Sequence, residues 1–265
     1  WLTTLWSAGL FFALPVLQSM NLGLMTNSAG YLSRYDANKL LSDENYVVLI
    51  GVIIAGIIAA CVVQAYMNSK IQNDFWLSLP VRREKLFAAN LTAGAMAVLI
   101  PLTGAYILTS VLTVFTPNMS RMFEIGMVFS GYLRATGLFL VAYAITTLWC
   151  VLSGRTIIAV LCSLFTPVMI SGTMILAAFI CQTEYKTFYG SILLSDNIIA
   201  LCPFGPFFAT AATDVSGHSM IVMDIVWVVV AVGLLILSVW LYQKRPSEKA
   251  GNALVYPKVL PIVKY

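Results

Sequence analysis

The chain has 265 residues, of which 60% are hydrophobic and only 10% are charged, and its mean hydropathy is +0.90. A soluble globular domain is about half apolar and about a quarter charged. A chain this apolar has too few polar residues to cover a water-exposed surface, so lipid must be the solvent for much of it. The composition therefore excludes chemistry that needs a soluble active site and predicts an integral membrane protein.

Six apolar runs are long enough to cross a bilayer as helices, which takes about 20 residues each. In chain order they are residues 1–24, 46–67, 86–115, 128–153, 156–181 and 221–242. Unpaired backbone groups cannot lie in hydrocarbon, and the alternating pattern of β-barrel strands is absent, so we expect helices. The sequence predicts a single all-α transmembrane domain over residues 1–265, a polytopic bundle of about six helices.

Prolines and small residues within these runs predict features of the helices. Each proline removes a helix hydrogen bond, so bends are expected at Pro15, Pro101 and Pro167. Small residues at a spacing of four allow helices to approach closely. Such pairs, which are also common in membrane helices for no specific reason, are Gly9 and Ala13, Gly56 and Ala60, and Ala93 and Ala97.

The orientation follows from the basic residues, which favour the cytoplasmic side. Ten of the 15 Lys and Arg residues fall on one side of the predicted spans, namely Lys70, Arg82, Arg83, Lys85, Arg155, Lys244, Arg245, Lys249, Lys258 and Lys264. Most acidic residues fall on the other side. We therefore expect a multi-pass protein of the cell membrane with both termini in the cytoplasm and a cytoplasmic tail at 243–265.

Two predicted outer segments join the spans, at residues 25–45 and 182–220. The middle of the second, Ile198–Ala212, is too short and too broken by proline to span. It is either a re-entrant or interfacial element or an apolar loop packed on the bundle. Cys181 and Cys202 flank this segment and can either pair or remain buried as small apolar residues.

The 68–85 segment, between the second and third spans, is the most informative part of the sequence. Three apolar residues recur with the spacing of one helix face, Ile71, Phe75 and Leu79. They predict a short amphipathic helix over about 69–80 that ends at Pro80 and leads into a basic turn. From the residues alone, a helix lying on the membrane, with Trp76 as anchor and the basic cluster on anionic lipid, is favoured over partner docking.

The run from Phe75 to Phe87, FWLSLPVRREKLF, resembles the LP-x-(S/R)-R-x-x-(L/I) segment of ABC-2-type permeases. These are the membrane subunits of ATP-driven exporters, and in them this segment also follows the second helix. Six spans with both ends inside, and a long outer segment between the fifth and sixth, also match the family. The run KRPSEKAG, from Lys244 to Gly251, resembles a Firmicutes-type branch of it, some members of which continue beyond this point.

The resemblance implies an ABC-2 (type V exporter-like) architecture and a coupling helix that docks on a separate ABC ATPase subunit. It assigns that contact to Asp74, Phe75, Trp76, Leu79, Pro80, Arg82, Arg83 and Lys85. It also implies two ATPase subunits, which bind ATP and Mg²⁺, and a second permease that is either identical or a paralogue. The substrate would be amphipathic or hydrophobic: a peptide, a lipid or a drug.

A substrate path is expected along the second and fifth helices, which lie near the dimer seam in that family. The candidates to line it are Gln64, Tyr66, Ser163, Thr166, Ser171 and Thr173. The Ser and Thr residues can equally well bond the backbone of their own helices.

The sequence lacks the residues needed for nucleotide binding, for a histidine-based metal site and for ion-coupled transport. No Gly-x-x-x-x-Gly-Lys-Ser/Thr motif is present, so the chain has no P-loop of its own for ATP. The sequence holds one histidine, His218, which excludes a metal site built from several histidines. Charge deep in the spans is nearly absent, which argues against ion-coupled transport. We expect no enzyme, no metal or cofactor bound by this chain and no nucleic acid; the alternative function is a membrane anchor or sensor whose cytoplasmic helix binds another partner.

Overall fold

The computed structural model describes residues 46–69, 72, 75–76, 78, 80–115, 125–184, 200–212 and 218–245. Within them the regular elements are helices, and five are long and apolar enough to cross a membrane: Val48–Asn68, Arg83–Val111, Val128–Leu152, Thr156–Glu184 and Ile221–Gln243. The chain is therefore a multi-pass, all-helical membrane protein, as predicted. The expected first span at 1–24, the loop at 25–45 and the tail beyond residue 245 lie outside the described residues.

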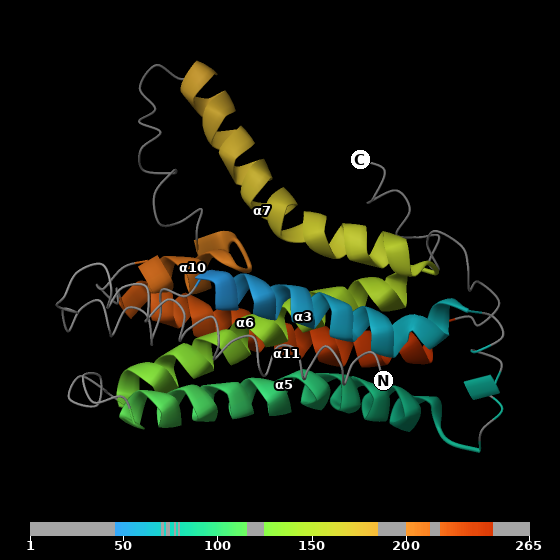
Figure 1. The fold of residues 1–265 in the computed structure, drawn as a ribbon. Helices are drawn as coiled ribbons and strands as arrows, with labels where there is room; N and C mark the ends of the chain where they lie inside the picture. Colours follow the sequence, from blue (N-terminus) through green and yellow to red (C-terminus); the bar gives the residue numbers. More distant parts are fainter. Residues whose placement is uncertain are drawn as a thin grey trace.

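The five long helices begin and end close to the predicted bounds (Figure 1). They are α3 (Tyr46–Gln64), which continues as the 3₁₀ helix η1 (Ala65–Asn68), then α5 (Arg83–Phe115), α6 (Ile125–Leu152), α7 (Thr156–Glu184) and α11 (His218–Gln243). The largest difference at any end is three residues, as at the start of α5. There the predicted basic turn forms the first helical turn, in which the Leu86 amide donates to the Arg82 carbonyl at 3.2 Å.

Helix α6 is the centre of the bundle, and α3 and α11 pack most extensively against it. Buried residues make up 72% of its membrane span, against 56% for α3 and 7% for α7. Leu138, Phe139 and Tyr143 are completely buried in it. Like the largely exposed α7, α6 shows no polar face, as expected of a helix that lies in a bilayer.

Small residues determine how closely α3 and α5 approach α6. A Cβ placed on Gly56 would lie 3.3 Å from Ala142 Cβ, and Ala60, one turn later, is fully buried. The predicted Gly56–Ala60 pair therefore lies at a helix interface. Ala93 is exposed, so the Ala93–Ala97 pair is not used in this way.

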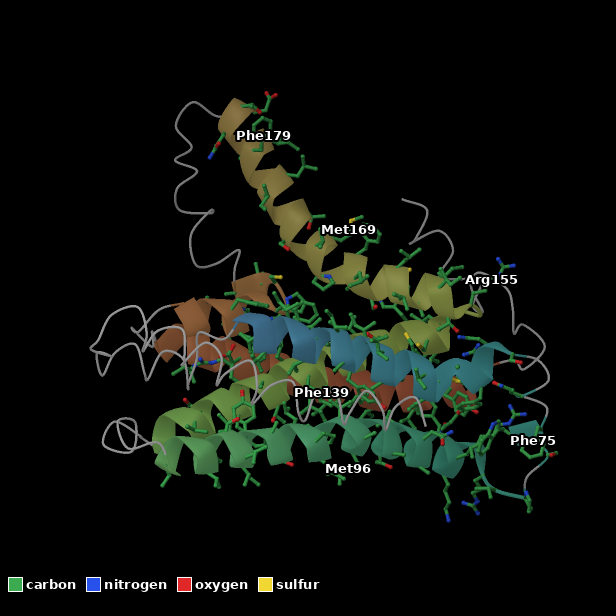
Figure 2. All side chains as sticks on the ribbon, viewed as in Figure 1. Phe75, Met96, Phe139, Arg155, Met169 and Phe179 are labelled. Atoms are coloured by element: carbon green, nitrogen blue, oxygen red, sulfur yellow. The ribbon has the colours of Figure 1, made fainter. Side chains whose placement is uncertain are left out.

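Helix α7 runs along the bundle, bends near Met169 and then leaves it (Figures 1 and 2). Pro167 lies inside the helix, where it removes one backbone donor. The carbonyl of Pro167 accepts a hydrogen bond from Ser171 Oγ at 2.7 Å and a weak one from Cys202 Sγ at 3.9 Å. The predicted bend is confirmed here, and the apolar side chains beyond it, such as Met169 and Phe179, are exposed in this single chain.

The short helix α10 (Gly205–Ala212) packs on the bundle beside α11. Its Phe207 is buried against Gly137 of α6, where an added Cβ would lie 3.0 Å from the ring. Just before it, the Ala200 carbonyl accepts a hydrogen bond from Trp227 Nε1 at 2.9 Å. Residues 200–212 therefore pack on the bundle, and 205–212 form a helix instead of a loop; whether this part is re-entrant or interfacial stays a prediction. Cys181 and Cys202 are not joined in a disulfide.

Candidate partner-docking site at the basic end of the bundle

Five helix ends meet at one end of the bundle, here called the basic end, where η1, α6 and α11 finish and α5 and α7 begin (Figure 1). They meet because successive long helices run in opposite directions. Exposed cationic side chains gather there, namely Arg82, Arg83, Lys85, Arg155 and Lys244. The concentration of positive charge predicted from the sequence is therefore a feature of one end of the fold.

Within the 68–85 segment, two adjacent aromatic residues differ in burial, although their rings contact each other edge-to-face with centroids 6.2 Å apart. Phe75 is 64% exposed at the edge of the molecule, as Figure 2 shows. Trp76 is half-buried and packs against the cluster of buried side chains at this end, with its ring 5.9 Å from that of Tyr66. The segment is therefore held to the bundle by one aromatic ring and presents the other outward.

The predicted amphipathic helix is described only in part. Gln72, Phe75 and Trp76 have helical backbone, and a turn follows in which Ser78 Oγ donates to the Phe75 carbonyl at 2.7 Å. Asp74 and Leu79 lie outside the described residues. Pro80, Arg82, Arg83 and Lys85 are all exposed.

Aromatic stacking fixes the start of α5 to the end of α11. The rings of Phe87 and Tyr242 stack with centroids 4.6 Å apart and planes 18° apart, and Phe87 is fully buried. Tyr66 Oη donates to Tyr242 Oη at 3.4 Å, which brings the end of α3 into the same cluster. Trp76 therefore rests on a rigid aromatic base made from three helices.

Arg245, the second residue after α11, is buried under this base and is only 7% exposed. Its guanidinium donates to the carbonyls of Cys150 at 3.0 Å, Met67 at 3.2 Å and Ser153 at 3.2 Å. It also contacts Asn68 Oδ1 at 3.4 Å and Met67 Sδ at 3.5 Å. Sequence reasoning counted Arg245 as one basic residue of the tail, because nothing local shows that its partners precede it by more than 90 residues.

The six residues proposed to line a substrate path do not form one surface. Gln64 is fully buried in α3, and neither atom of its amide has a hydrogen-bond partner. Tyr66 is buried in the aromatic base. Gln64 of α3 and Tyr66 of η1 therefore face the inside of this chain.

The four candidates on α7 use their hydroxyls largely within the fold. Ser163, which is buried, donates to the Val160 carbonyl at 2.8 Å, and Ser171 donates to Pro167. Thr166 donates to the Cys162 carbonyl at 2.6 Å and accepts from Trp149 Nε1 at 2.8 Å. Thr173 is exposed beyond the bend. Backbone bonding, the simpler of the two readings, therefore holds for Ser163, Thr166 and Ser171.

No protein-family model, curated protein or solved structure matches the chain. Among the described residues, no group of three or more His, Cys, Asp and Glu side chains is placed to hold a metal ion.

Proposed function

We propose that this chain is the membrane-spanning permease subunit of an ABC exporter and that its 68–85 segment docks on a separate ATP-binding subunit. The observation that carries the proposal is the division between Phe75 and Trp76. A helix that only lay on the membrane would use Trp76 as its headgroup anchor. Because Trp76 packs on Tyr66 instead, the segment is fixed to the bundle and Phe75 is left as an exposed apolar contact. An exposed aromatic ring beside charged residues is typical of a protein-docking site.

The charges beside Phe75 support the same interpretation. Arg83 and Lys85 lie in the first turn of α5, and Arg82 directly precedes it. Cations near a helix N-terminus are unfavourable by about 0.3–1 kcal/mol each, because the N-terminus carries partial positive charge. Helix stability therefore does not explain these cations, which share the first turn with Glu84. Their cytoplasmic position accounts for part of the pattern, and an acidic partner surface, as the resemblance implies, would complement their exposed charge.

In the proposed mechanism, ATP binding brings two partner ATPase subunits together, and the 68–85 segment moves with them. The segment joins η1 to α5, so its displacement acts directly on the ends of α3 and α5. The chain itself holds no ATP or Mg²⁺; these are bound by the partner. A second copy or a paralogue completes the permease in the cell membrane, with the basic end in the cytoplasm.

The substrate class follows from the chemistry of the spans. Their side chains are overwhelmingly apolar, with a few hydroxyl and amide groups. Such a surface suits an amphipathic or hydrophobic molecule, such as a peptide, a lipid or a drug. Charge deep in the spans is nearly absent, with Arg134 of α6 and Asp224 of α11 toward the ends away from the basic end, which argues against coupling to an ion gradient.

Affinity purification of the chain from its native membrane in mild detergent tests the proposal. We expect an ATP-binding-cassette subunit to co-purify and the complex to hydrolyse ATP. If no such subunit co-purifies under conditions that keep a known ABC complex intact, the exporter assignment is wrong. The alternative, a membrane anchor or sensor, then becomes the better account, with the 68–85 segment binding a different protein.

A further inference from the structure

Arg245 occupies a position that the docking role of the 68–85 segment does not by itself explain. It follows the last turn of α11, where its own amide donates to the Tyr242 carbonyl at 3.1 Å. Its side chain then turns into the bundle instead of extending toward water. A buried arginine is costly to desolvate unless its charge and its donors are matched, and here several acceptors surround it.

The acceptors are backbone carbonyls at the ends of two other helices. Met67 lies in the last turn of η1, and Cys150 and Ser153 lie at the end of α6. The last carbonyls of a helix have no partner within that helix, and together they carry partial negative charge. One guanidinium therefore satisfies carbonyls of two helices and places its positive charge between two negative helix ends.

Only the planar fork of arginine suits this arrangement. Its terminal nitrogens Nη1 and Nη2 reach Cys150 on one side and Met67 and Ser153 on the other at the same time. Lysine carries its charge on a single nitrogen at the end of a flexible stem and cannot bridge groups spread in this way. The shape of the side chain, as well as its charge, determines what it holds together.

The Arg245 contacts continue into the 68–85 segment and into α7. Tyr66, the neighbour of Met67, contacts Trp76 and hydrogen-bonds to Tyr242, which lies one turn before Arg245. Asn68 accepts from Arg245 through Oδ1 and donates through Nδ2 to Thr156 Oγ1, at the start of α7, at 2.9 Å. The guanidinium therefore lies where the base of Trp76, the end of α6 and the start of α7 meet.

We propose that Arg245 is a positioning residue, which holds the base of the docking segment in register with the ends of α6 and α7. This role rests on the proposed function. If an ATPase displaces the 68–85 segment, Arg245 passes the displacement to α6 and α7, in addition to α3 and α5, which the segment joins directly. Without the guanidinium the segment still presents Phe75, but its movement is no longer passed to α6 and α7.

Hydrogen–deuterium exchange of the purified full chain in nanodiscs tests the positioning role without any partner. The variants are Arg245→Lys and Arg245→Gln, and the matched control is Lys244→Gln. Lys244 is the adjacent cation, but it is exposed and lies 3.6 Å above the ring of Trp240 on its own helix. We expect both Arg245 variants to raise exchange about tenfold in peptides covering residues 65–69 and 150–156, because charge-assisted hydrogen bonds between these ends are lost. The control should exchange like the wild type.

Two results would overturn the proposal. If Arg245→Lys exchanges like the wild type, positive charge alone is sufficient and the bridging geometry is irrelevant. If exchange rises only within residues 241–245, Arg245 merely caps its own helix. Should neither Arg245 variant accumulate, Asn68→Ala takes their place. It leaves the guanidinium and its three carbonyl contacts in place but removes the Oδ1 contact to Arg245 and the link to Thr156, so we expect faster exchange at 156–160, and unchanged exchange there would count against the proposal.

A second measurement separates this inference from the exporter assignment. If an ATPase co-purifies with the wild type, Arg245→Lys should retain it while losing the effect of the permease on the ATPase rate. A variant that keeps both the subunit and the wild-type rate contradicts the positioning role. If no ATPase co-purifies with the wild type, the proposed function fails, and the exchange experiment still decides the role of Arg245.

Discussion

The ring of Phe87, near the start of α5, stacks on the ring of Tyr242, near the end of α11, although 155 residues separate them in the chain. The contact joins α5 to α11 at the basic end. Of the described long helices, α5 is the first after the 68–85 segment and α11 is the last. Tyr66 hydrogen-bonds to Tyr242 of this pair, and the ring of Trp76 packs against that of Tyr66. The docking surface therefore depends on a stacked pair that it does not itself contain.

Phe87→Ala should destabilise the protein by about 3 kcal/mol, because it removes a fully buried ring together with its stacking partner's contact. The free energy of unfolding in mild detergent measures this. Ile100→Ala is the matched control, since Ile100 lies on the same helix and is 61% exposed in this chain. Equal losses of unfolding free energy in the two variants would show that the stacked ring contributes no more to stability than an exposed side chain.

Phe75→Asp should weaken association with an ATPase subunit roughly 30-fold, the loss expected when an aromatic residue that contributes about 2 kcal/mol is removed. The yield of co-purified ATPase measures the change, and membrane insertion should be unaffected because Phe75 is exposed. Gln72→Asp, which adds the same charge at a nearby exposed position, is the control. Unchanged co-purification of the Phe75 variant would remove this ring from the docking surface.

Replacing Arg82 and Arg83 together by Glu should abolish ATPase association, and wild-type association should weaken as salt concentration rises. Both effects follow if the exposed cations attract an acidic partner surface through solvent-screened charge. Arg155→Glu reverses an exposed charge at the same end but outside the 68–85 segment, and it should bind nearly as well as the wild type. Association that does not depend on salt, with a double variant that still binds, would exclude an electrostatic contact.

Gly94→Ala should destabilise the bundle by about 1–3 kcal/mol, the usual effect of overpacking. A Cβ at residue 94 would lie 2.6 Å from Tyr143 Oη and 2.9 Å from Val63 Cγ2. Tyr143→Phe removes that hydroxyl and its 2.8 Å hydrogen bond to the Leu91 carbonyl, at a loss of about 1 kcal/mol.

The double variant Gly94→Ala with Tyr143→Phe tests whether the two groups compete for the same space. We expect it to lose less stability than the two single variants added together, because the phenyl ring leaves room for the new methyl group. Thermal unfolding of the four proteins in one detergent completes the cycle. Strict additivity would mean that the clash lies with Val63 instead.

Hydropathy predicts the spans of this chain well, because the length of an apolar run is set by the bilayer and is visible locally. It predicts their packing poorly, because every face of a membrane helix is apolar whether it meets lipid or protein. The buried position of α6 and the exposed one of α7 could not be distinguished in this way. Small residues at a spacing of four predict packing only in part, because the Gly56–Ala60 pair lies at an interface and the Ala93–Ala97 pair does not.

The candidate site was predicted in outline for a related reason. The motif from Phe75 to Lys85 is continuous in sequence, so its exposed phenyl ring and cations were identifiable. Arg245 was not, because its partners are backbone carbonyls, which every residue carries and no sequence pattern marks. The same holds for Gln64, whose complete burial depends on which way α3 is rotated.

The bend of α7 separates a part of the protein that is covered by other helices from a part that is exposed. Most of helix α6 is buried by the other described helices, although Phe129 and Leu133 are exposed, so most of its environment is the same in any bilayer. Beyond Pro167, apolar side chains of α7 are exposed within the described part of the chain, so acyl chains, another subunit or a part of the chain outside the described residues covers them. The thickness and composition of the surrounding membrane therefore act on this half of α7 first, which makes it the part of the molecule most responsive to its lipid environment.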